Sequence, residues 1–494
     1  MKRRMTELKT EIFRFSSHFF KSFFFLYESK NNLPFFDSFM LIGIDDTDSN
    51  KGMCTTYLAA LLADELKAYG TTAVFPYLIR LNPTIPYKTR GNAALGMDLR
   101  LADESDLLIR EQIVSHVIRR ISEYAETDCD QTNPGAVFIF EEMYDKIKEP
   151  LNLFFQKAVT DVIEIEEAFS LIDSFKSFTS FTSFKSITSL EKHAGFVHFF
   201  MKNGRGLIGS LAVCGAMLNP NPEATYEYLA YRLPKNWGNR GGPVRFVDPK
   251  SLIEADRQTS PETWDTIDYS KKSKPFPVCV PASDDPVLYG IRGNSQKAVI
   301  EAAGFVVSEE IERFCVFQTN QGTDSHLLFA ESFEELKAFH SYVACGTVHS
   351  PAETREGGHD IFSVADGDGN ILECAAFEPT GPFRHIIRKL LRGDEVTVFG
   401  SFKNQTLNLE KIKINSIAPA FQFDNPVCPV CEKRMESSGQ NQGFRCKKCK
   451  TKADDKIQIP MSRGLKTGFY EVPPSARRHL SKPLIRYSEE EKNG

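Results

Sequence analysis

Three carboxylates stand within four residues near the start of the chain, at Asp45, Asp46 and Asp48. They follow the short apolar run 41–44, which predicts a buried strand. Clustered carboxylates repel one another, so a cation should lie among them, and a magnesium ion that carries a nucleotide phosphate is the natural candidate. The alternative is an Asp-rich turn that only caps the following helix.

A helix is expected directly after this acidic loop, over residues 55–67. Gly52 lies in the polar turn before it, and Thr55 or Thr56 is the expected N-cap. The free N–H groups and the positive dipole end of a helix start attract phosphate. These residues therefore leave two interpretations open, a magnesium–phosphate site and a simple helix cap.

The segment 80–92 could supply cations to the same phosphates. It holds two prolines, one aromatic residue and three cations, so we expect a stiffened basic loop. Lys88 and Arg90 are candidate phosphate ligands, because Arg matches phosphate oxygens as a fork and Lys acts as a point charge. A surface loop with solvated charges is the alternative.

Two Cys-x-x-Cys pairs near the C-terminus predict a metal site. Cys428 and Cys431 form one pair, and Cys446 and Cys449 form the other. Each pair can place two thiolates on one metal, and the intervening loop lets the pairs close into a tetrahedron, which is the zinc-ribbon pattern. Because four protein ligands occupy all four coordination positions of zinc, this site predicts a small folded module and not catalysis. The alternative, in which the four cysteines are unrelated thiols, is disfavoured by the spacing of the two pairs.

Length and composition describe a multidomain globular protein. A chain of 494 residues is too long for one core and suggests three or four domains. The seven other cysteines are scattered and odd in number, which disfavours a disulfide framework and favours a reducing cytoplasm. No apolar run of about 18 residues is present, so no membrane span is expected.

Charge is distributed unevenly along the chain. The segment from Asn425 to Gly494 holds 15 Lys and Arg against 8 Asp and Glu, a net charge of about +7, whereas the whole chain carries −5. The remainder is therefore about −12. An acidic body with a basic, zinc-bearing tail suits a protein that grips a polyanion at one end. A solvated basic face is the alternative.

Two segments look like additions to the working protein. Residues 1–39 are rich in Phe but lack the continuous apolar core and cleavage site of a signal peptide, so Met40 is the expected start. Residues 175–189 read as five consecutive triplets, such as Phe-Thr-Ser. A period of three fits neither helix nor strand, so we expect a loop there.

The remaining chain divides into an α/β unit over 40–204, a second α/β unit over 205–335, a strand-rich unit over 338–420 and a tail over 425–494. The strand-rich unit fits a five-stranded OB barrel, which commonly binds single-stranded nucleic acid. The expected strands are 41–44, 136–140, 313–317, 361–364, 371–377, 395–402 and 406–415. The expected helices, besides 55–67, are 104–125, 152–170, 382–392 and one that begins at Ser295.

Taken together, these motifs resemble the archaeal tRNA-isoleucine 2-agmatinylcytidine synthetase (TiaS) family over nearly everything from Met40 to about Arg486. Residues 1–39 and the triplet repeat depart from the resemblance, and neither falls on a chemical motif. The segments that carry it are 44–48 with 52–56, 80–92, 132–136, 204–209, 374–380, the zinc ribbon, 468–474 and 477–480.

The resemblance implies an ATP-dependent tRNA-modifying ligase. It implies that agmatine replaces the 2-oxo group of the wobble cytidine in a CAU-anticodon isoleucine tRNA, so that the tRNA reads AUA. It also implies a kinase-like domain over 40–204, a ferredoxin-like domain over 205–335, an OB-fold and a zinc ribbon. By the same resemblance, the Asp cluster serves phosphoryl chemistry and Thr55 is autophosphorylated.

This chemistry is consistent with the residues. A ring carbonyl oxygen leaves poorly, but its phosphate ester leaves well, so an amine can then displace it. Asp45, Asp46 and Asp48 would hold magnesium, while Arg477 and Arg478 in the basic tail are candidate contacts to tRNA phosphates. Two alternatives remain, a nucleic-acid-binding protein without catalysis and another nucleotide-dependent kinase. ATP consumption that requires both tRNA and agmatine would separate them.

Overall fold

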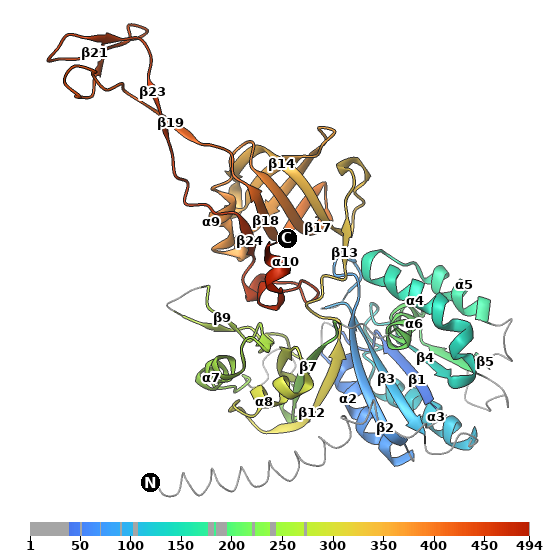
Figure 1. The fold of residues 1–494 in the computed structure, drawn as a ribbon. Helices are drawn as coiled ribbons and strands as arrows, with labels where there is room; N and C mark the ends of the chain where they lie inside the picture. The colour runs from blue at the N-terminus through green and yellow to red at the C-terminus, as the bar shows by residue number, and fades with distance from the viewer. Residues whose placement is uncertain are drawn as a thin grey trace, which may run out of the picture. The chain divides into compact units, whose positions relative to one another are not determined.

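The computed structural model describes residues 39–493, apart from 50–51, 70, 89–90, 102–106, 176–181, 184–194, 220–222, 238–243 and 271–273. Arg90, residues 1–38 and nearly all of the triplet repeat therefore lie outside the described residues. The chain forms two compact units (Figure 1). The first runs to Ile267 and includes Pro277–Ser325, and the second comprises Asp268–Phe276 and the chain from His326 onward.

The first unit is built on one ten-stranded sheet with the order β5-β6-β4-β1-β3-β2-β12-β7-β11-β8. Its strands are β1 (Phe39–Asp45), β2 (Thr71–Arg80), β3 (Ala93–Leu101), β4 (Gly135–Phe140), β5 (Thr182–Ser183), β6 (Phe196–Phe200), β7 (Thr225–Arg232), β8 (Thr263–Trp264), β11 (Val287–Gly293) and β12 (Ile311–Thr319). Its helices are α2 (Thr55–Glu65), α3 (Leu107–Tyr124), α4 (Tyr144–Thr160), α5 (Ile165–Phe175), α6 (Gly206–Leu218), α7 (Pro249–Thr259) and α8 (Gln296–Ala303). The short strands β9 (Ile267–Asp268) and β10 (Phe276–Pro277) pair with each other.

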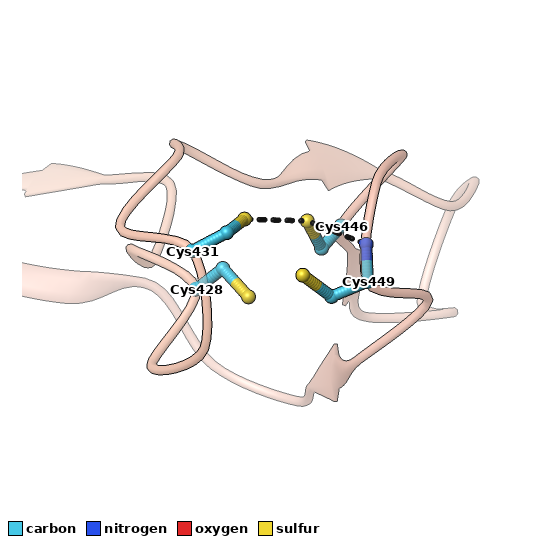
Figure 2. Close-up of side chains that lie close together, drawn as sticks. All are labelled: Cys428, Cys431, Cys446 and Cys449. Atoms are coloured by element: carbon cyan, nitrogen blue, oxygen red, sulfur yellow. Dashed lines mark hydrogen bonds between the residues drawn. The ribbon is translucent and has the colours of Figure 1, made fainter.

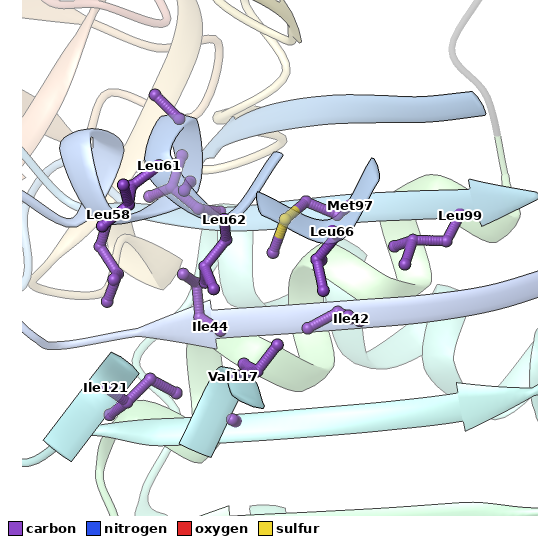
Figure 3. Close-up of a cluster of buried hydrophobic side chains, with 14 of the residues drawn as sticks. Ile42, Ile44, Leu58, Leu61, Leu62, Leu66, Met97, Leu99, Val117 and Ile121 are labelled. Carbon is purple, nitrogen blue, oxygen red and sulfur yellow. The ribbon is translucent and has the colours of Figure 1, made fainter. Parts of the chain in front are cut away.

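Strand β1 lies in the middle of this sheet, antiparallel to both β3 and β4. Its alternate residues Ile42 and Ile44 point into a core that α2 and α3 cover, as Figure 3 shows with Leu62 and Val117. The expected strand 41–44 is thus confirmed. Because β1 is buried on both faces, it reads as a continuous apolar run and does not alternate with polar residues.

The opposite face of the sheet is covered by α6, which approaches the backbone closely. A Cβ on Gly43 would stand 2.2 Å from the backbone oxygen of Ser210, and a Cβ on Gly96 would stand 2.7 Å from the Val213 side chain. Side chains at these two positions would force the helix away from the sheet. Glycine at these two positions therefore permits the close packing that places the start of α6 beside Asp45.

The helix prediction for 152–170 needs correction. The expected helix 152–170 is wrong, because α4 ends at Thr160 and α5 begins at Ile165. Asp161 between them has an extended backbone, and its carboxylate accepts a hydrogen bond from the Val162 N–H at 2.7 Å. An Asp that bonds its neighbouring backbone in this way competes with helix formation.

The predicted N-cap of α2 is also wrong. Cys54 occupies the N-cap with an extended backbone and makes no side-chain cap hydrogen bond, so Thr55 is the first helical residue. The prediction for 104–125 is confirmed as α3, the one from Ser295 as α8, and those for 136–140 and 313–317 as β4 and β12. At α8, the Ser295 hydroxyl accepts from the Ala298 N–H and caps the helix.

The two expected α/β units share this sheet. Strand β12 pairs in parallel with β2, so that Gln318 lies opposite Tyr77, and it pairs antiparallel with β7. The strands β12-β7-β11-β8 form the far part of the sheet, and α8 packs on them through Val299 and Ala302. Helix α6, which follows the boundary expected at 204/205, packs against β1, so the first half of the sheet also depends on residues from beyond that boundary.

In the second unit, five strands close into a barrel with the order β14-β15-β16-β18-β17 and back to β14. The pair β16–β18 is parallel and the other pairs are antiparallel. The strands of this unit are β13 (Leu327–Phe329), β14 (His340–Thr354), β15 (Asp360–Ala365), β16 (Ile371–Ala376), β17 (Glu395–Lys403), β18 (Thr406–Ser416) and β24 (Gly468–Glu471), and its helices are α9 (Phe383–Ile387) and α10 (Glu489–Asn493).

The four strands expected in this region are confirmed as β15 to β18, whereas the 15-residue β14 was not expected. The helix expected over 382–392 is shorter, because α9 ends at Ile387 and the chain then turns through Gly393, whose φ is 94°. The barrel interior holds a core that includes Val348, Phe362 and Ile412.

The segment with the four cysteines folds into short strands. Strands β20 (Glu436–Ser437), β21 (Phe444–Arg445) and β22 (Lys452–Ala453) form one small sheet, and β19 (Phe421–Asp424) pairs with β23 (Ile457–Pro460). Across the described part of the chain, no helix combines the length and the apolar character needed to cross a membrane.

Candidate active site and metal centre

The acidic loop begins where β1 ends. Asp45 is the last residue of the strand, and the chain leaves it through Asp46, whose φ of 58° lies in the left-handed region. Asp is one of the few residues that adopt this conformation readily. The Asp45 carboxylate accepts the Asp46 N–H at 2.7 Å, which stabilises the turn.

Asp45 and Asp46 are half-buried residues. Burial raises the pKa of Asp45 well above its usual range, and the neighbouring Asp46 raises it further. Burial also raises the pKa of Asp46 to about 6, with a further contribution from Asp48, while hydrogen bonds from Asn133 and the positive charge of Arg205 oppose the rise. Removal from water and mutual repulsion therefore disfavour the ionised cluster, and a bound cation would relieve both.

Helix α6 approaches this loop at its first turn. A Cβ on Gly209 would stand only 1.9 Å from Oδ2 of Asp45, and one on Gly206 would stand 2.7 Å from the Asp45 backbone oxygen. The Gly206 N–H donates to the backbone oxygen of Asn133 at 2.9 Å. The fold thus joins three distant segments at this point, namely the end of β1, the residues before β4 and the start of α6.

Further hydrogen bonds hold the acidic loop against the segment before β4. The Glu126 N–H donates to the Thr47 backbone oxygen at 3.1 Å, and the Thr132 hydroxyl donates to the Asp48 backbone oxygen at 2.8 Å. The loop is therefore supported from outside itself. A turn that serves only to cap α2 does not require this support.

Thr55 and Gly52 lie next to this loop. The Thr55 side chain is buried, and its hydroxyl accepts a hydrogen bond from the Thr47 hydroxyl at 3.1 Å. Phosphorylation of Thr55 stays a prediction, and the acceptor would be the same hydroxyl that is bonded to Thr47. The Ser49 N–H donates to the Gly52 backbone oxygen at 3.2 Å, and a Cβ on Gly52 would meet nothing nearer than 3.9 Å. Space does not demand glycine at Gly52, and its role in phosphate binding also stays a prediction.

The cations of the segment 80–92 have different environments. Arg80 is buried, its guanidinium lies 4.0 Å from Glu227, and burial lowers its pKa to about 10. The Lys88 ammonium group donates a hydrogen bond to the Pro83 backbone oxygen. Because Arg90 lies outside the described residues, the phosphate roles of Lys88 and Arg90 stay predictions.

Arg205 and Asn133 are the site residues that sequence reasoning did not single out. Arg205 is the N-cap of α6 and its guanidinium stacks on the Tyr87 ring at 4.0 Å from the ring centre. Both residues stand in segments that resemble the family, 132–136 and 204–209. That likeness was the available signal, but composition and periodicity gave no reason to bring the two segments to Asp45.

The four predicted cysteines meet, as Figure 2 shows for Cys428, Cys431, Cys446 and Cys449. Their sulfur atoms all lie within 4.8 Å of one another, and those of Cys431 and Cys446 are 3.5 Å apart. Zinc–sulfur bonds of about 2.3 Å in a tetrahedron separate the sulfurs by roughly 3.8 Å. The thiolate set and its spacing therefore fit zinc.

The two halves of this metal centre repeat the same backbone geometry. Glu432 and Lys450, the residues after each pair, have φ values of 58° and 62° and donate their N–H groups to the backbone oxygens of Cys428 and Cys446. The Cys449 N–H donates to the Cys446 sulfur at 3.4 Å and thereby lowers the pKa of that thiol. Turns that direct N–H groups at sulfur stabilise thiolates, which are the form that binds a metal.

Arg477 and Arg478 are engaged within the second unit. Arg477 is buried, with 4% of its side chain exposed, and pairs with Glu471 at 2.7 Å. Arg478 pairs with the buried Glu410 at 3.2 Å. Burial alone would raise the pKa of Glu410, but His326 and Arg478 lower it to about 2. The tRNA contacts predicted for both arginines stay untested, and the geometry favours a structural role for Arg477.

Family comparisons cover most of the chain. The TiaS TCKD domain matches residues 41–181, the TiaS FLD domain matches 204–326, and the TiaS C-terminal zinc ribbon domain matches 425–465.

Individual relatives agree with these matches. The chain is 52% identical to the tRNA-isoleucine 2-agmatinylcytidine synthetase TiaS of Methanosarcina acetivorans over 448 residues, which are 90% of this chain and 97% of that protein. It is 44% identical to the Archaeoglobus fulgidus protein of the same name, over 91% of this chain and 98% of that one.

Solved structures match over similar lengths. A complex of TiaS with isoleucine tRNA and ATP matches with a TM-score of 0.77 and 42% identity, covering 92% of this chain and 99% of that one. A complex of TiaS with isoleucine tRNA, AMPCPP and agmatine matches with a TM-score of 0.75 and 40% identity, covering 92% and 98%. The motifs, the folded units and the 52% identity over nearly the full length of a relative together show that the chain belongs to the tRNA-isoleucine 2-agmatinylcytidine synthetase (TiaS) family.

Proposed function

We propose that this protein is an ATP-dependent ligase that joins agmatine to C2 of the wobble cytidine in a CAU-anticodon isoleucine tRNA, so that the tRNA decodes AUA. The observation that carries the proposal is 52% identity to a tRNA-isoleucine 2-agmatinylcytidine synthetase over 97% of that protein's length. The half-buried acidic loop at Asp45 is consistent with it, because phosphoryl chemistry needs a cation in a preorganised position.

The reaction requires an oxygen to leave the ring. The C2 oxygen attacks a phosphoryl group of ATP, and the shortened nucleotide leaves. The primary amine of agmatine then attacks C2, loses a proton, and displaces the oxygen as phosphate. Asp45, Asp46 and Asp48 are proposed to hold magnesium, which would neutralise charge on the phosphates. Gly52, Lys88 and Arg90 are proposed to complete the phosphate site, and Thr55 is proposed to accept a phosphoryl group.

Zinc has a structural role in this proposal. All four ligands come from the protein, at Cys428, Cys431, Cys446 and Cys449, so no coordination position remains for substrate. The metal would hold together a segment that contains only short strands and a four-residue buried cluster. Arg477 and Arg478, later in the basic tail, are the proposed tRNA contacts, and the exposure of Arg478 makes it the better candidate of the two.

The domain assignments are part of the proposal. A kinase-like domain over 40–204 and a ferredoxin-like domain over 205–335 share the long sheet, and the antiparallel order β12-β7-β11-β8 supports the second of these labels. The closed five-strand order with α9 between β16 and β17 supports an OB-fold over 338–420. The zinc ribbon and tail occupy 425–494. A reducing cytoplasm is proposed from the cysteines, none of which forms a disulfide.

The deciding experiment measures ATP consumption and agmatine incorporation with purified protein. ATP should be consumed in proportion to product only when both CAU-anticodon isoleucine tRNA and agmatine are present. Mass spectrometry of the digested tRNA should find the added agmatine on the wobble cytidine. A methionine tRNA with the same anticodon is the control.

Other outcomes would favour the two alternatives. Tight tRNA binding without ATP turnover would support a nucleic-acid-binding protein. ATP turnover that does not depend on agmatine would support another nucleotide-dependent kinase.

A further inference from the structure

Arg205 is a cation at the edge of the acidic loop, and the proposed reaction assigns no role to it. It is the N-cap of α6 and follows Gly204, whose φ of 78° suits glycine. The next residue, Gly206, packs against the backbone of Asp45 and bonds to Asn133. The main chain therefore fixes Arg205 beside the end of β1.

The guanidinium of Arg205 is held by an aromatic ring and not by an acid. It lies 4.0 Å from the centre of the Tyr87 ring. Among the described residues, no carboxylate oxygen lies within 4.0 Å of its nitrogens. Stacking holds a guanidinium flat while it leaves the N–H donors at its edge available, whereas an ion pair would occupy them.

The two described cations of the segment 80–92 have protein partners in this structure, which a bound phosphate would have to replace. Arg80 is buried near Glu227, and Lys88 donates to the Pro83 backbone oxygen. Arg205, in contrast, directly precedes Gly206, where a Cβ would stand 2.7 Å from the Asp45 backbone oxygen. It is therefore near enough to act with a metal ion held by the carboxylates of the acidic loop, and it keeps the planar fork that matches two phosphate oxygens.

We propose that Arg205, stacked on Tyr87, binds the phosphate chain of ATP next to the cation held by the acidic loop. This inference rests on the proposed function and names a further residue for it. The carboxylates would bind one side of the phosphate chain through magnesium, and the guanidinium would bind oxygens directly. Tyr87 would act as a positioning residue, because it orients Arg205 and does not itself need to touch the nucleotide.

The test measures the dissociation constant for MgATP at saturating magnesium. Arg205→Ala should raise the dissociation constant for MgATP by about 10- to 100-fold, which is the expected effect of losing a hydrogen bond to a charged group. Arg205→Lys should recover part of the loss, since Lys keeps the charge but not the fork. Affinity for adenosine, which lacks phosphate, should not change in either variant, and the KM for agmatine should stay within about twofold.

The Tyr87 variants separate orientation from charge. Tyr87→Phe keeps the ring and should bind MgATP like the parent. Tyr87→Leu should lower the affinity for MgATP by roughly two- to fivefold, as expected for the loss of an exposed cation–π contact. Lys202→Ala is the matched control. Lys202 stands three residues from Arg205, is exposed, and donates to the Cys129 backbone oxygen at 2.6 Å, so its loss should leave MgATP affinity unchanged.

The alternative role for Arg205 is only to neutralise the carboxylates. In that case, Arg205→Ala would bind Mn²⁺ more tightly and would keep its MgATP affinity at saturating magnesium, and this result would overturn the inference. An equal loss of adenosine and MgATP affinity would also overturn it, because the damage would then be general. A parent protein that binds MgATP but transfers no agmatine would refute the proposed function, while the dissociation constants would still decide the role of Arg205.

Discussion

The carboxylate of Asp45 lies so close to the first turn of α6 that Gly209 leaves no space for a side chain, since a Cβ there would stand 1.9 Å from Oδ2. Gly209→Ala should therefore displace either Asp45 or the helix. We expect about 1–3 kcal/mol of lost stability, as for overpacking elsewhere, and a large loss of agmatine transfer. Gly367→Ala is the control, because its Cβ would meet nothing within 4 Å. Parent-like turnover in Gly209→Ala would show that the contact does not position Asp45.

Asp46→Asn should abolish agmatine transfer and leave tRNA binding largely intact. Removing a charge from a magnesium site costs several kcal/mol of transition-state stabilisation, which corresponds to at least about a hundredfold in rate. Turnover and filter binding of tRNA would check both parts. Near-normal turnover in Asp45→Asn, Asp46→Asn and Asp48→Asn alike would contradict the assignment of the acidic loop.

The same substitution should change how stability depends on pH. Burial raises the pKa of Asp46 to about 6, above the 3.8 of an ordinary Asp, so the folded protein binds the proton more tightly than the unfolded chain does. Without magnesium, the ionised Asp46 should therefore reduce stability as pH rises from about 4 to 6. Asp46→Asn should gain thermal stability over the parent above pH 6 and lose that advantage near pH 4. Saturating magnesium should shrink the difference.

Thr55 is either a phosphoryl acceptor or a buried hydrogen-bond partner of Thr47. Incubation with ATP should add the mass of one phosphate to the peptide that contains Thr55 if the first role holds. Thr55→Ser should keep both roles, while Thr55→Val keeps the shape and loses both, at about 1 kcal/mol for the lost hydrogen bond. No mass change in the parent, together with an active Thr55→Val, would leave only the structural role.

Cys446→Ser should release zinc and unfold the ribbon locally, because metal-binding energy is folding energy in such small modules. We expect weaker tRNA binding with an unchanged MgATP dissociation constant, since the acidic loop belongs to the other unit. Elemental analysis and proteolysis of the ribbon would measure the effect. Cys345→Ser, at an exposed cysteine outside the metal centre, is the matched control. The prediction fails if freshly purified parent protein contains no zinc.

Arg477 and Arg478 can be separated by the salt dependence of tRNA binding. Each phosphate contact that is lost should flatten the slope of log affinity against log salt by about one unit. Arg477→Ala should instead lower the melting temperature, because it removes a buried side chain and its ion pair with Glu471. Arg478, which is 30% exposed, is the better candidate for a flatter slope. An unchanged slope in both variants would mean that the tRNA is gripped elsewhere.

The sequence by itself determined the local features of this protein. The apolar run before Asp45 specified β1, because a strand covered on both faces needs no polar residue. The two Cys-x-x-Cys pairs specified the metal centre, because each pair is a short-range unit with its own turn. The family could also be recognised from the order and spacing of its motifs.

Only the tertiary structure decided which distant segments meet. The approach of Asn133, Arg205 and Gly209 to Asp45 depends on how α6 packs across glycines in the sheet, and residue spacing cannot encode such a contact. The break at Asp161 and the burial of Arg477 are similar cases. A charged side chain reads the same in a sequence whether it is solvated or paired, and its energetic role depends on the charges and the solvent that the fold places around it.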